Sequence, residues 1–174
     1  TMDPMDVLRN LADRFTMLYE TEWKAALGDL SQEPEHKDGN IKLLADILEL
    51  NVSVNVQKDT SKSLRQYRQD TAMLSVPAIQ MMFTRKHLKK MLDPERHTEN
   101  ILSYASKCVE LTWQFNIQSP PMCFLWARPA QKITGHLTVY EKLGELVRYN
   151  VWPTLLTHQG GSVLCKGIVQ PHWT

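Results

Sequence analysis

Apolar residues recur at helical spacing through most of the first 117 positions. Near the start they stand three and four positions apart, at Leu8, Leu11, Phe15, Leu18 and Tyr19. This spacing places them on one face of an amphipathic helix. Repeated along the chain, the pattern predicts helices over residues 4–30, 40–75, 77–92 and 94–117. Three of these begin at a proline, which suits the first turn of a helix.

Residues 118–174 lose the helical spacing. The Ser-Pro-Pro at 119–121 ends the last predicted helix, because proline cannot continue one. The apolar run at 122–127 fits either a helix or a buried strand, and the run at 162–169 has strand-like composition. No repeat or linker divides the chain. We therefore expect one mostly α domain over 1–174, a helical bundle with an irregular C-terminal segment (118–174) that includes short strands.

Composition sets the broad class of the protein. A chain of 174 residues with 43% hydrophobic content is large enough to bury a core. No run of eighteen apolar residues is present, and the opening residues lack a signal-peptide pattern. The three cysteines are odd in number and far apart, which fits reduced thiols. We expect a cytoplasmic protein without disulfides.

Charge is distributed unevenly behind a formal net charge of +1. Residues 1–50 carry five Lys/Arg against eleven Asp/Glu, a balance of −6. Residues 51–90 carry eight Lys/Arg against two Asp, a balance of +6. The middle of the chain is therefore basic, which favours an anionic partner.

Two predicted helices carry these cations on one side. At about 100° per residue, Lys62 and Arg65 fall within about 40° of Lys58, and an apolar set lies opposite as the expected core face. That expected core face consists of Val56, Leu64, Tyr67, Thr71 and Leu74. In the helix at 77–92, the expected core face consists of Met81, Leu88, Met91 and Leu92. The remaining sector of that helix holds Arg85, Lys86, Lys89 and Lys90, with Ile79, Met82 and Phe83 in or beside it.

Cations interleaved with apolar side chains are typical of a surface that meets anionic lipid, since cations attract headgroups while apolar groups enter below them. The predicted lipid-binding residues are Lys58, Lys62, Arg65, Arg68, Arg85, Lys86, Lys89, Lys90, Met82 and Phe83. Two simpler interpretations stay open: an ordinary solvated face, and a helix packed on both sides. Nucleic acid would use the same cations, but no nucleic-acid motif accompanies them.

The stretch at 150–170 holds a Gly pair and a Lys-Gly that invite a phosphate-binding interpretation. A phosphate-binding loop needs a glycine-framed loop before Lys-Ser/Thr and a following helix. Here Lys166 is followed by Gly167, Gly160 and Gly161 are adjacent, and no helix start follows. A nucleotide site is therefore disfavoured.

Cysteine or metal chemistry in this stretch is equally weak. Cys165 stands among apolar residues, which favours a buried thiol over an activated nucleophile. His158, Cys165 and His172 are spaced too widely for a zinc site, whose ligands come in pairs two to five residues apart. We predict no catalytic residue, no metal and no cofactor; a cysteine-dependent hydrolase is kept as a minor alternative.

Three stretches resemble the C-terminal domain of the mitochondria-eating protein family: NLADRFTMLYETEW near the start, CVELTWQFNIQSPPM in the middle and VWPTLLTHQGGSVLCKGIVQ at the end. The residues that carry this resemblance are Trp113, Gln118, Pro120, Pro121, Val151, Trp152, Pro153, Gly160, Gly161, Leu164, Cys165, Lys166 and Gly167. The resemblance implies structural roles for them, with Trp152 packing, Pro153 bending the chain and the Gly pair forming a tight turn.

The resemblance also implies a non-enzymatic domain of a cytosolic protein that associates with mitochondria and takes part in their quality control. Longer members of that family carry coiled coils, self-associate and interact with cardiolipin and other mitochondrial lipids. We therefore expect binding to an anionic, cardiolipin-like phospholipid surface and self-association, in which the acidic N-terminal helix of one copy pairs with the basic segment of another. The rival hypothesis is a protein-interaction domain whose basic helices bind an acidic partner without lipid.

Overall fold

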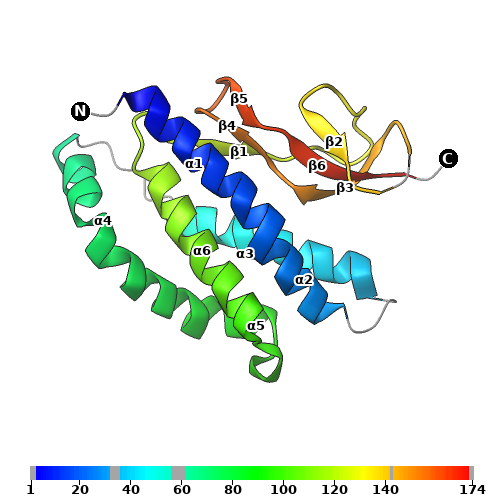
Figure 1. Cartoon of the computed structure of the whole chain (residues 1–174), viewed down its shortest axis with the longest axis horizontal. Helices are drawn as coiled ribbons and strands as arrows, with labels where there is room; N and C mark the ends of the chain where they lie inside the picture. Colours follow the sequence, from blue (N-terminus) through cyan, green and yellow to red (C-terminus); the bar gives the residue numbers. More distant parts are fainter. Residues whose placement is uncertain (1–2, 32–35, 56–61, 142, 173–174) are drawn as a thin grey trace. The chain divides into compact units, whose positions relative to one another are not determined.

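Helices occupy the first two thirds of the chain and strands occupy the last third (Figure 1). The computed structural model describes residues 3–31, 36–55, 62–141 and 143–172. They form two compact units: unit 1 combines Thr1–Thr16 with Ser119–Thr174, and unit 2 is Met17–Gln118. The helix α1 (Pro4–Leu18) begins in unit 1 and runs into unit 2.

Unit 2 is helical. After α1 the elements are a π-helical turn (Tyr19–Trp23), α2 (Lys24–Leu30), α3 (Lys37–Asn55), α4 (Lys62–Phe83), a second π-helical turn (Thr84–Leu88), α5 (Lys89–Met91), a 3-10 turn (Pro94–Arg96) and α6 (Glu99–Asn116). The predicted helix at 40–75 thus covers parts of α3 and α4, and residues 56–61 between them lie outside the described residues.

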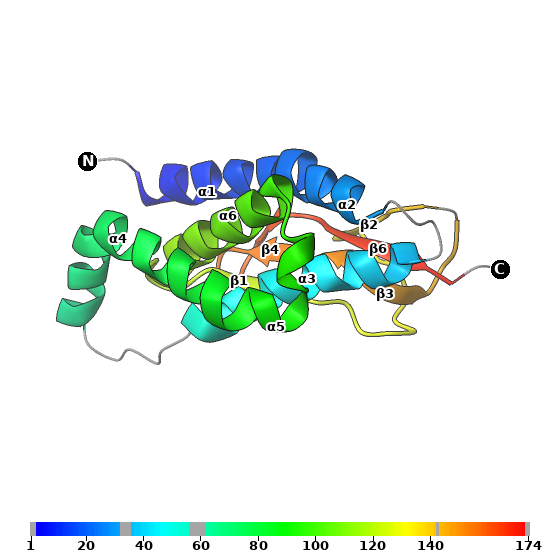
Figure 2. The same ribbon diagram turned by 90° about the horizontal axis from the view of Figure 1, so that it is seen from below.

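The helix α6 is the centre of unit 2 and contacts α2, α3 and α4 (Figure 2). Thr98 caps its start by accepting a hydrogen bond from the Ile101 backbone N–H at 3.3 Å. The fully buried Tyr104 donates its hydroxyl proton to the Leu44 carbonyl of α3 at 2.8 Å. This bond satisfies the one polar atom of a ring that is otherwise surrounded by the core of unit 2.

The predicted helix boundary at Pro77 is wrong, because α4 continues through this residue to Phe83. Pro77 lacks an N–H and removes one bond of the helical ladder, at a cost of about 3 kcal/mol. Contacts with α6 and with Ile117, the residue that follows it, hold the helix on both sides of the gap. Gln69 Nε2 donates to the Ile117 carbonyl at 2.6 Å, and Gln80 Nε2 donates to the Ser106 carbonyl at 2.9 Å.

The prediction of a mostly α bundle is also wrong. Unit 1 contains two three-stranded sheets, with strand orders β1-β4-β5 and β2-β6-β3. The strands are β1 (Cys123–Leu125), β2 (Leu137–Val139), β3 (Val147–Trp152), β4 (Thr154–Leu156), β5 (Val163–Cys165) and β6 (Gly167–Pro171). Within the described residues, only β2 pairs with a neighbour in parallel, and that neighbour is β6.

The run at 162–169, predicted to be strand-like, does hold β5 and most of β6. The two sheets were not predicted, because most strands are three residues long and several are buried on both faces. All three residues of β4 are buried, as are four of the five in β6. Such strands show no alternation of apolar and polar positions, which is the signal that distinguishes a half-buried strand. Periodicity therefore predicted an irregular segment where two sheets are formed.

A cluster of aromatic rings forms the core between α1 and the strands of unit 1. The fully buried Phe15 ring stacks on Trp152 of β3 with centroids 4.6 Å apart, and on Phe124 of β1 at 5.1 Å. A second cluster lies on the other sheet and consists of Ala127, Leu137, Val147 and Val169, with Ile133 packed against it. Unit 1 is therefore built from chain segments that are more than one hundred residues apart.

Candidate functional site

The cations of the second π-helical turn and α5 gather in one short exposed segment. Arg85, Lys86, Lys89 and Lys90 are all exposed. Leu88 between them is fully buried and anchors the segment. No ion pair joins these cations to a carboxylate in the part of the chain that the structure describes. We call these four residues the cationic cluster.

Two methionines precede the cationic cluster on α4. Met81 is 56% exposed and Met82 is 40% exposed, so both thioether side chains reach the surface. Met81 was predicted to belong to the core face, and its exposure corrects that prediction. Met82 was predicted to lie on the surface beside the cations, and this placement is confirmed.

Phe83 does not lie on this surface. Its side chain is 1% exposed and stacks on His87 with ring centroids 5.7 Å apart. The π-helical turn explains the error, because it brings residues five apart, here Phe83 and Leu88, toward the same side. At 100° per residue the two had been placed on opposite sides of one α-helix. Phe83 is therefore a core residue and does not belong to the proposed contact surface.

The face that α4 buries also differs from the prediction. Tyr67 and Leu74, expected in the core, are 64% and 79% exposed. The helix instead buries Val76 and Phe83, and long polar side chains add to its contact with α6. Arg68 is half-buried with its guanidinium 6.0 Å from the centre of the Trp113 ring, in a cation–π arrangement. Polar side chains with apolar stems can cover part of a packing face, and apolar periodicity does not count such residues.

The predicted lipid-binding residues therefore separate into three groups. The cationic cluster and Met82 are together and exposed, whereas Arg68 is engaged at the contact between α4 and α6. Lys62 and Arg65 belong to α4, but the surroundings of their side chains lie outside the described residues, as does Lys58 altogether. The structure thus brings together only the C-terminal half of the predicted set.

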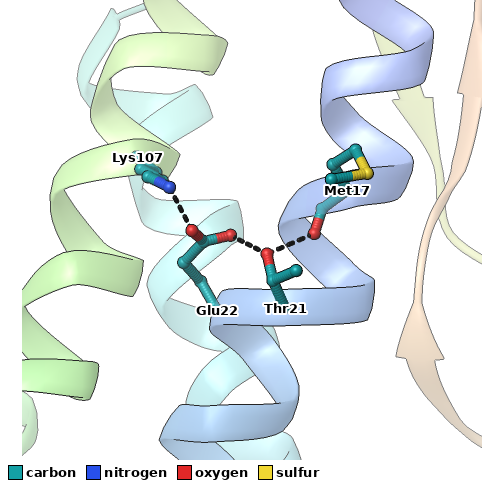
Figure 3. A network of polar contacts seen from close by, with 4 residues as sticks. All are labelled: Met17, Thr21, Glu22 and Lys107. Carbon is teal, nitrogen blue, oxygen red and sulfur yellow. Dashed lines mark hydrogen bonds and ion pairs between the residues drawn. The ribbon is translucent and has the colours of Figure 1, made fainter.

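The acidic residues near the start of unit 2 are partly engaged within the chain. Glu22 is paired with Lys107 of α6, and its other carboxylate oxygen contacts the Thr21 hydroxyl (Figure 3). The Thr21 hydroxyl also lies 2.7 Å from the Met17 carbonyl. Burial alone would raise the pKa of Glu22, but the hydrogen bonds from Lys107 and Thr21 outweigh it and lower the pKa. An ionised, cation-bound carboxylate has a structural role here.

The cysteines are free thiols in environments that suppress reactivity. Burial raises the pKa of Cys165, whose Sγ lies 3.4 Å from the Ala12 carbonyl and 3.5 Å from the Thr16 hydroxyl. Burial also raises the pKa of Cys108, which is fully buried. A nucleophilic cysteine needs the opposite shift. Among the described residues, no group of three His, Cys, Asp or Glu side chains could hold a metal ion.

The Val-Trp-Pro and Leu-Cys-Lys-Gly sequences meet where the chain passes between the two sheets. Pro153 separates β3 from β4, and Lys166 separates β5 from β6. Gly167 lies directly against Thr154: a Cβ at residue 167 would stand 2.6 Å from the Thr154 hydroxyl oxygen and 2.9 Å from its backbone nitrogen. Pro153 lacks the N–H that would continue the hydrogen bonding of β3, and Gly167 permits the start of β6 to approach Thr154 closely.

The Gly pair forms the turn between β4 and β5. Gly160 has φ of 75°, in the left-handed region that favours glycine. The Thr157 backbone N–H donates to the Ser162 carbonyl at 3.0 Å and closes the loop. The predicted tight turn is thus confirmed, and the motif of residues 150–170 is a structural corner with a hairpin.

Comparison with known families gives one match over this region. The sequence model of the mitochondria-eating protein family matches residues 56–171, which is two thirds of the chain. The chain belongs to the mitochondria-eating protein family. No curated protein and no solved structure matches it.

Membership of this family supports a role in mitochondrial quality control and an association with mitochondria. The matched residues include α4, the cationic cluster and the corner formed by Pro153 and Gly167. None of the helices that the structure describes has the length and apolarity needed to cross a bilayer.

Proposed function

We propose that this chain is a non-enzymatic, cytoplasmic domain of a mitochondrial quality-control protein, and that it binds anionic, cardiolipin-like phospholipid at the mitochondrial surface. The observation that carries the proposal is the cationic cluster beside exposed Met82. No cofactor or metal takes part in this function.

The contact combines two physical terms. Each Lys or Arg near an anionic bilayer contributes about 1 kcal/mol of attraction, so the four cations supply about 4 kcal/mol. Each methylene that leaves water adds about 0.8 kcal/mol, which the Met82 side chain supplies when it enters the headgroup region. The summed binding free energy of these two terms is sufficient for reversible binding to the membrane surface and insufficient for permanent insertion.

Co-sedimentation with liposomes tests the proposal. Neutral phosphatidylcholine vesicles and vesicles containing cardiolipin are compared at physiological salt, with the wild-type chain and a Lys86→Gln/Lys89→Gln/Lys90→Gln variant. Loss of three cations at about 1 kcal/mol each is expected to weaken binding to the anionic vesicles about 100-fold. The matched control, Arg128→Gln/Lys132→Gln/Lys166→Gln, removes the same charge from exposed positions of unit 1.

The two variants separate the possible outcomes. A large effect of the first variant and a small effect of the control support lipid binding at the cationic cluster. Equal losses would show that net charge alone governs binding, which would refute this site. Failure of the wild-type chain to bind would favour the rival hypothesis, in which the basic helices bind an acidic protein.

We also propose that the domain supports self-association, because α4 exposes large apolar side chains that a second protein surface could cover. The pairing of the acidic N-terminal helix with the basic segment of another copy is one route. That route has fewer carboxylates available than the sequence suggested, since Glu20 binds Lys24 and Glu22 binds Lys107 within the same chain. Oligomers formed by such charge pairing would weaken as salt shortens the Debye length from about 10 Å at 0.1 M to about 3 Å at 1 M.

A further inference from the structure

The outward side of α4 carries an apolar stripe that nothing in the described part of unit 2 covers. Tyr67, Leu74 and Met81 follow one another at intervals of seven residues, with exposures of 64%, 79% and 56%. Seven residues are close to two helical turns, so these side chains lie above one another along the helix. Met73, at 83% exposure, flanks the stripe. The helix lies beside α6 at the edge of unit 2 (Figures 1 and 2).

The stripe has a symmetric arrangement about the peptide that joins Pro77 to Ala78. Leu74 stands three positions before Pro77, and Met81 stands three positions after Ala78. Asp70 and Arg85 stand seven positions out on either side, and both are exposed. Apolar residues therefore occupy the inner positions, and opposite charges occupy the outer ones.

We infer that α4 and the π-helical turn that continues it pair in antiparallel fashion with the same segment of a second copy of this chain, about a two-fold axis between Pro77 and Ala78. This inference rests on the proposed self-association and identifies its surface. The axis places Leu74 of each copy against Met81 of the other, and Asp70 of each copy against Arg85 of the other. The exposed Pro77 and Ala78 are small, which permits a close helix–helix distance at the centre.

Charge decides the direction of pairing. In a parallel pair, Asp70 would face Asp70 and Arg85 would face Arg85, and like charges in direct opposition are destabilising. In the antiparallel pair both contacts become attractive. A two-fold axis also makes the interface isologous, so one surface supplies both halves of the contact.

The same arrangement favours a second copy over a membrane as the occupant of the stripe. Asp70 lies next to the apolar residues, and a carboxylate is repelled by anionic headgroups and costly to bury in lipid. Lys86, Lys89 and Lys90 take no part in the Asp70–Arg85 contacts, so lipid binding and pairing can be tested with different variants.

Sedimentation velocity of the full chain over a range of concentrations, with charge-reversal variants, tests the inference. Asp70→Arg and Arg85→Asp each turn two attractive contacts into two repulsive ones, and each is expected to weaken association about tenfold or more. Matched controls are Glu95→Arg and Lys166→Asp, which make the same changes at exposed positions away from α4. Circular dichroism confirms that each variant is folded.

Two further samples test the register. An equimolar mixture of the D70R and R85D variants is expected to associate again, because each variant then supplies the charge that the other needs. The D70R/R85D double variant is expected to recover self-association in the same way. Failure of both samples to recover would overturn the antiparallel register.

The remaining outcomes distinguish this inference from the broader proposal. A wild-type chain that stays monomeric at all concentrations would overturn both self-association and α4 pairing. A wild-type oligomer that the single charge reversals leave unchanged would overturn α4 pairing alone, and self-association would then use another surface.

Discussion

Replacement of Phe15 by alanine tests the aromatic core that joins α1 to the strands of unit 1. The Phe15 ring is fully buried and stacks on Trp152 at 4.6 Å and on Phe124 at 5.1 Å. Truncation of a buried phenylalanine costs about 3–5 kcal/mol, because apolar contact is lost and a cavity remains. In a chain of this size, each kcal/mol lowers Tm by about 2–4 °C, so a decrease of about 6–20 °C is expected.

Burial and stacking are separated by two milder variants. Phe15→Leu keeps an apolar side chain but removes the ring, and Trp152→Leu does the same on the other side of the stack. A double-mutant cycle of these two changes, measured by urea denaturation, is expected to give a coupling energy of about 0.5–1.5 kcal/mol. A loss below about 1 kcal/mol for Phe15→Ala, or a coupling energy near zero, would refute the packing of α1 on these strands.

Three other features, namely the Glu22 ion pair, two glycines and the cysteine thiols, lead to measurable predictions. Hydrogen bonds hold the pKa of Glu22 below its ordinary value of 4.5, so the stability of about 0.5–1 kcal/mol that the Glu22–Lys107 pair adds is present above pH 4.5 and is lost as the pH falls through the lowered pKa. The difference in Tm between wild type and Glu22→Gln should therefore vanish in acid. A difference that persists below the lowered pKa would contradict the assignment. Gly28→Ala should raise the free energy of unfolding, measured by urea denaturation, by about 0.5–1 kcal/mol, since Gly28 is in a helix and an added Cβ would meet open space. Gly167→Ala should lower the free energy of unfolding by about 1–3 kcal/mol, because its Cβ would clash with Thr154. Equal effects of the two substitutions would contradict both predictions. A chromogenic thiol reagent at pH 7 should label Cys108 only when the chain unfolds, and should label Cys165 more slowly than an unhindered small-molecule thiol. Fast labelling of Cys165 in the folded chain would instead support the cysteine-dependent hydrolase.

The sequence predicted the helices best where an apolar stripe meets a core directly. In α6, Ile101, Tyr104, Cys108, Leu111 and Phe115 recur at helical spacing and all five are buried. In α4 the same reasoning chose the wrong face: Val76 and Phe83 are buried, whereas Tyr67 and Leu74 are exposed. Arg68 and Gln80 also contact α6 from the buried side. Periodicity shows that a helix has two faces, but long polar side chains can share the buried one with apolar residues.

The candidate site was predictable in its charges and not in its apolar neighbours. Exposure of Arg85, Lys86, Lys89 and Lys90 follows from the high cost of burying an unpaired cation. The burial of Phe83 depends on a π-helical turn at Thr84–Leu88, and a single extra residue in one turn changes which side each later residue occupies. The corner at Pro153 and Gly167 could be found as a motif, but its role required two segments to be seen in contact.

The discontinuity of unit 1 has a consequence for synthesis of the chain on the ribosome. Phe15 is made first, whereas Trp152 and β6 are made more than one hundred residues later. At about 5–20 residues per second, the first part of α1 waits roughly 5 to 30 s for the strands that cover it. Unit 2 is contiguous and can be completed first. During that interval the apolar face of α1 is available to a chaperone, and a fragment restricted to residues 56–171 would lack that half of the core of unit 1 altogether.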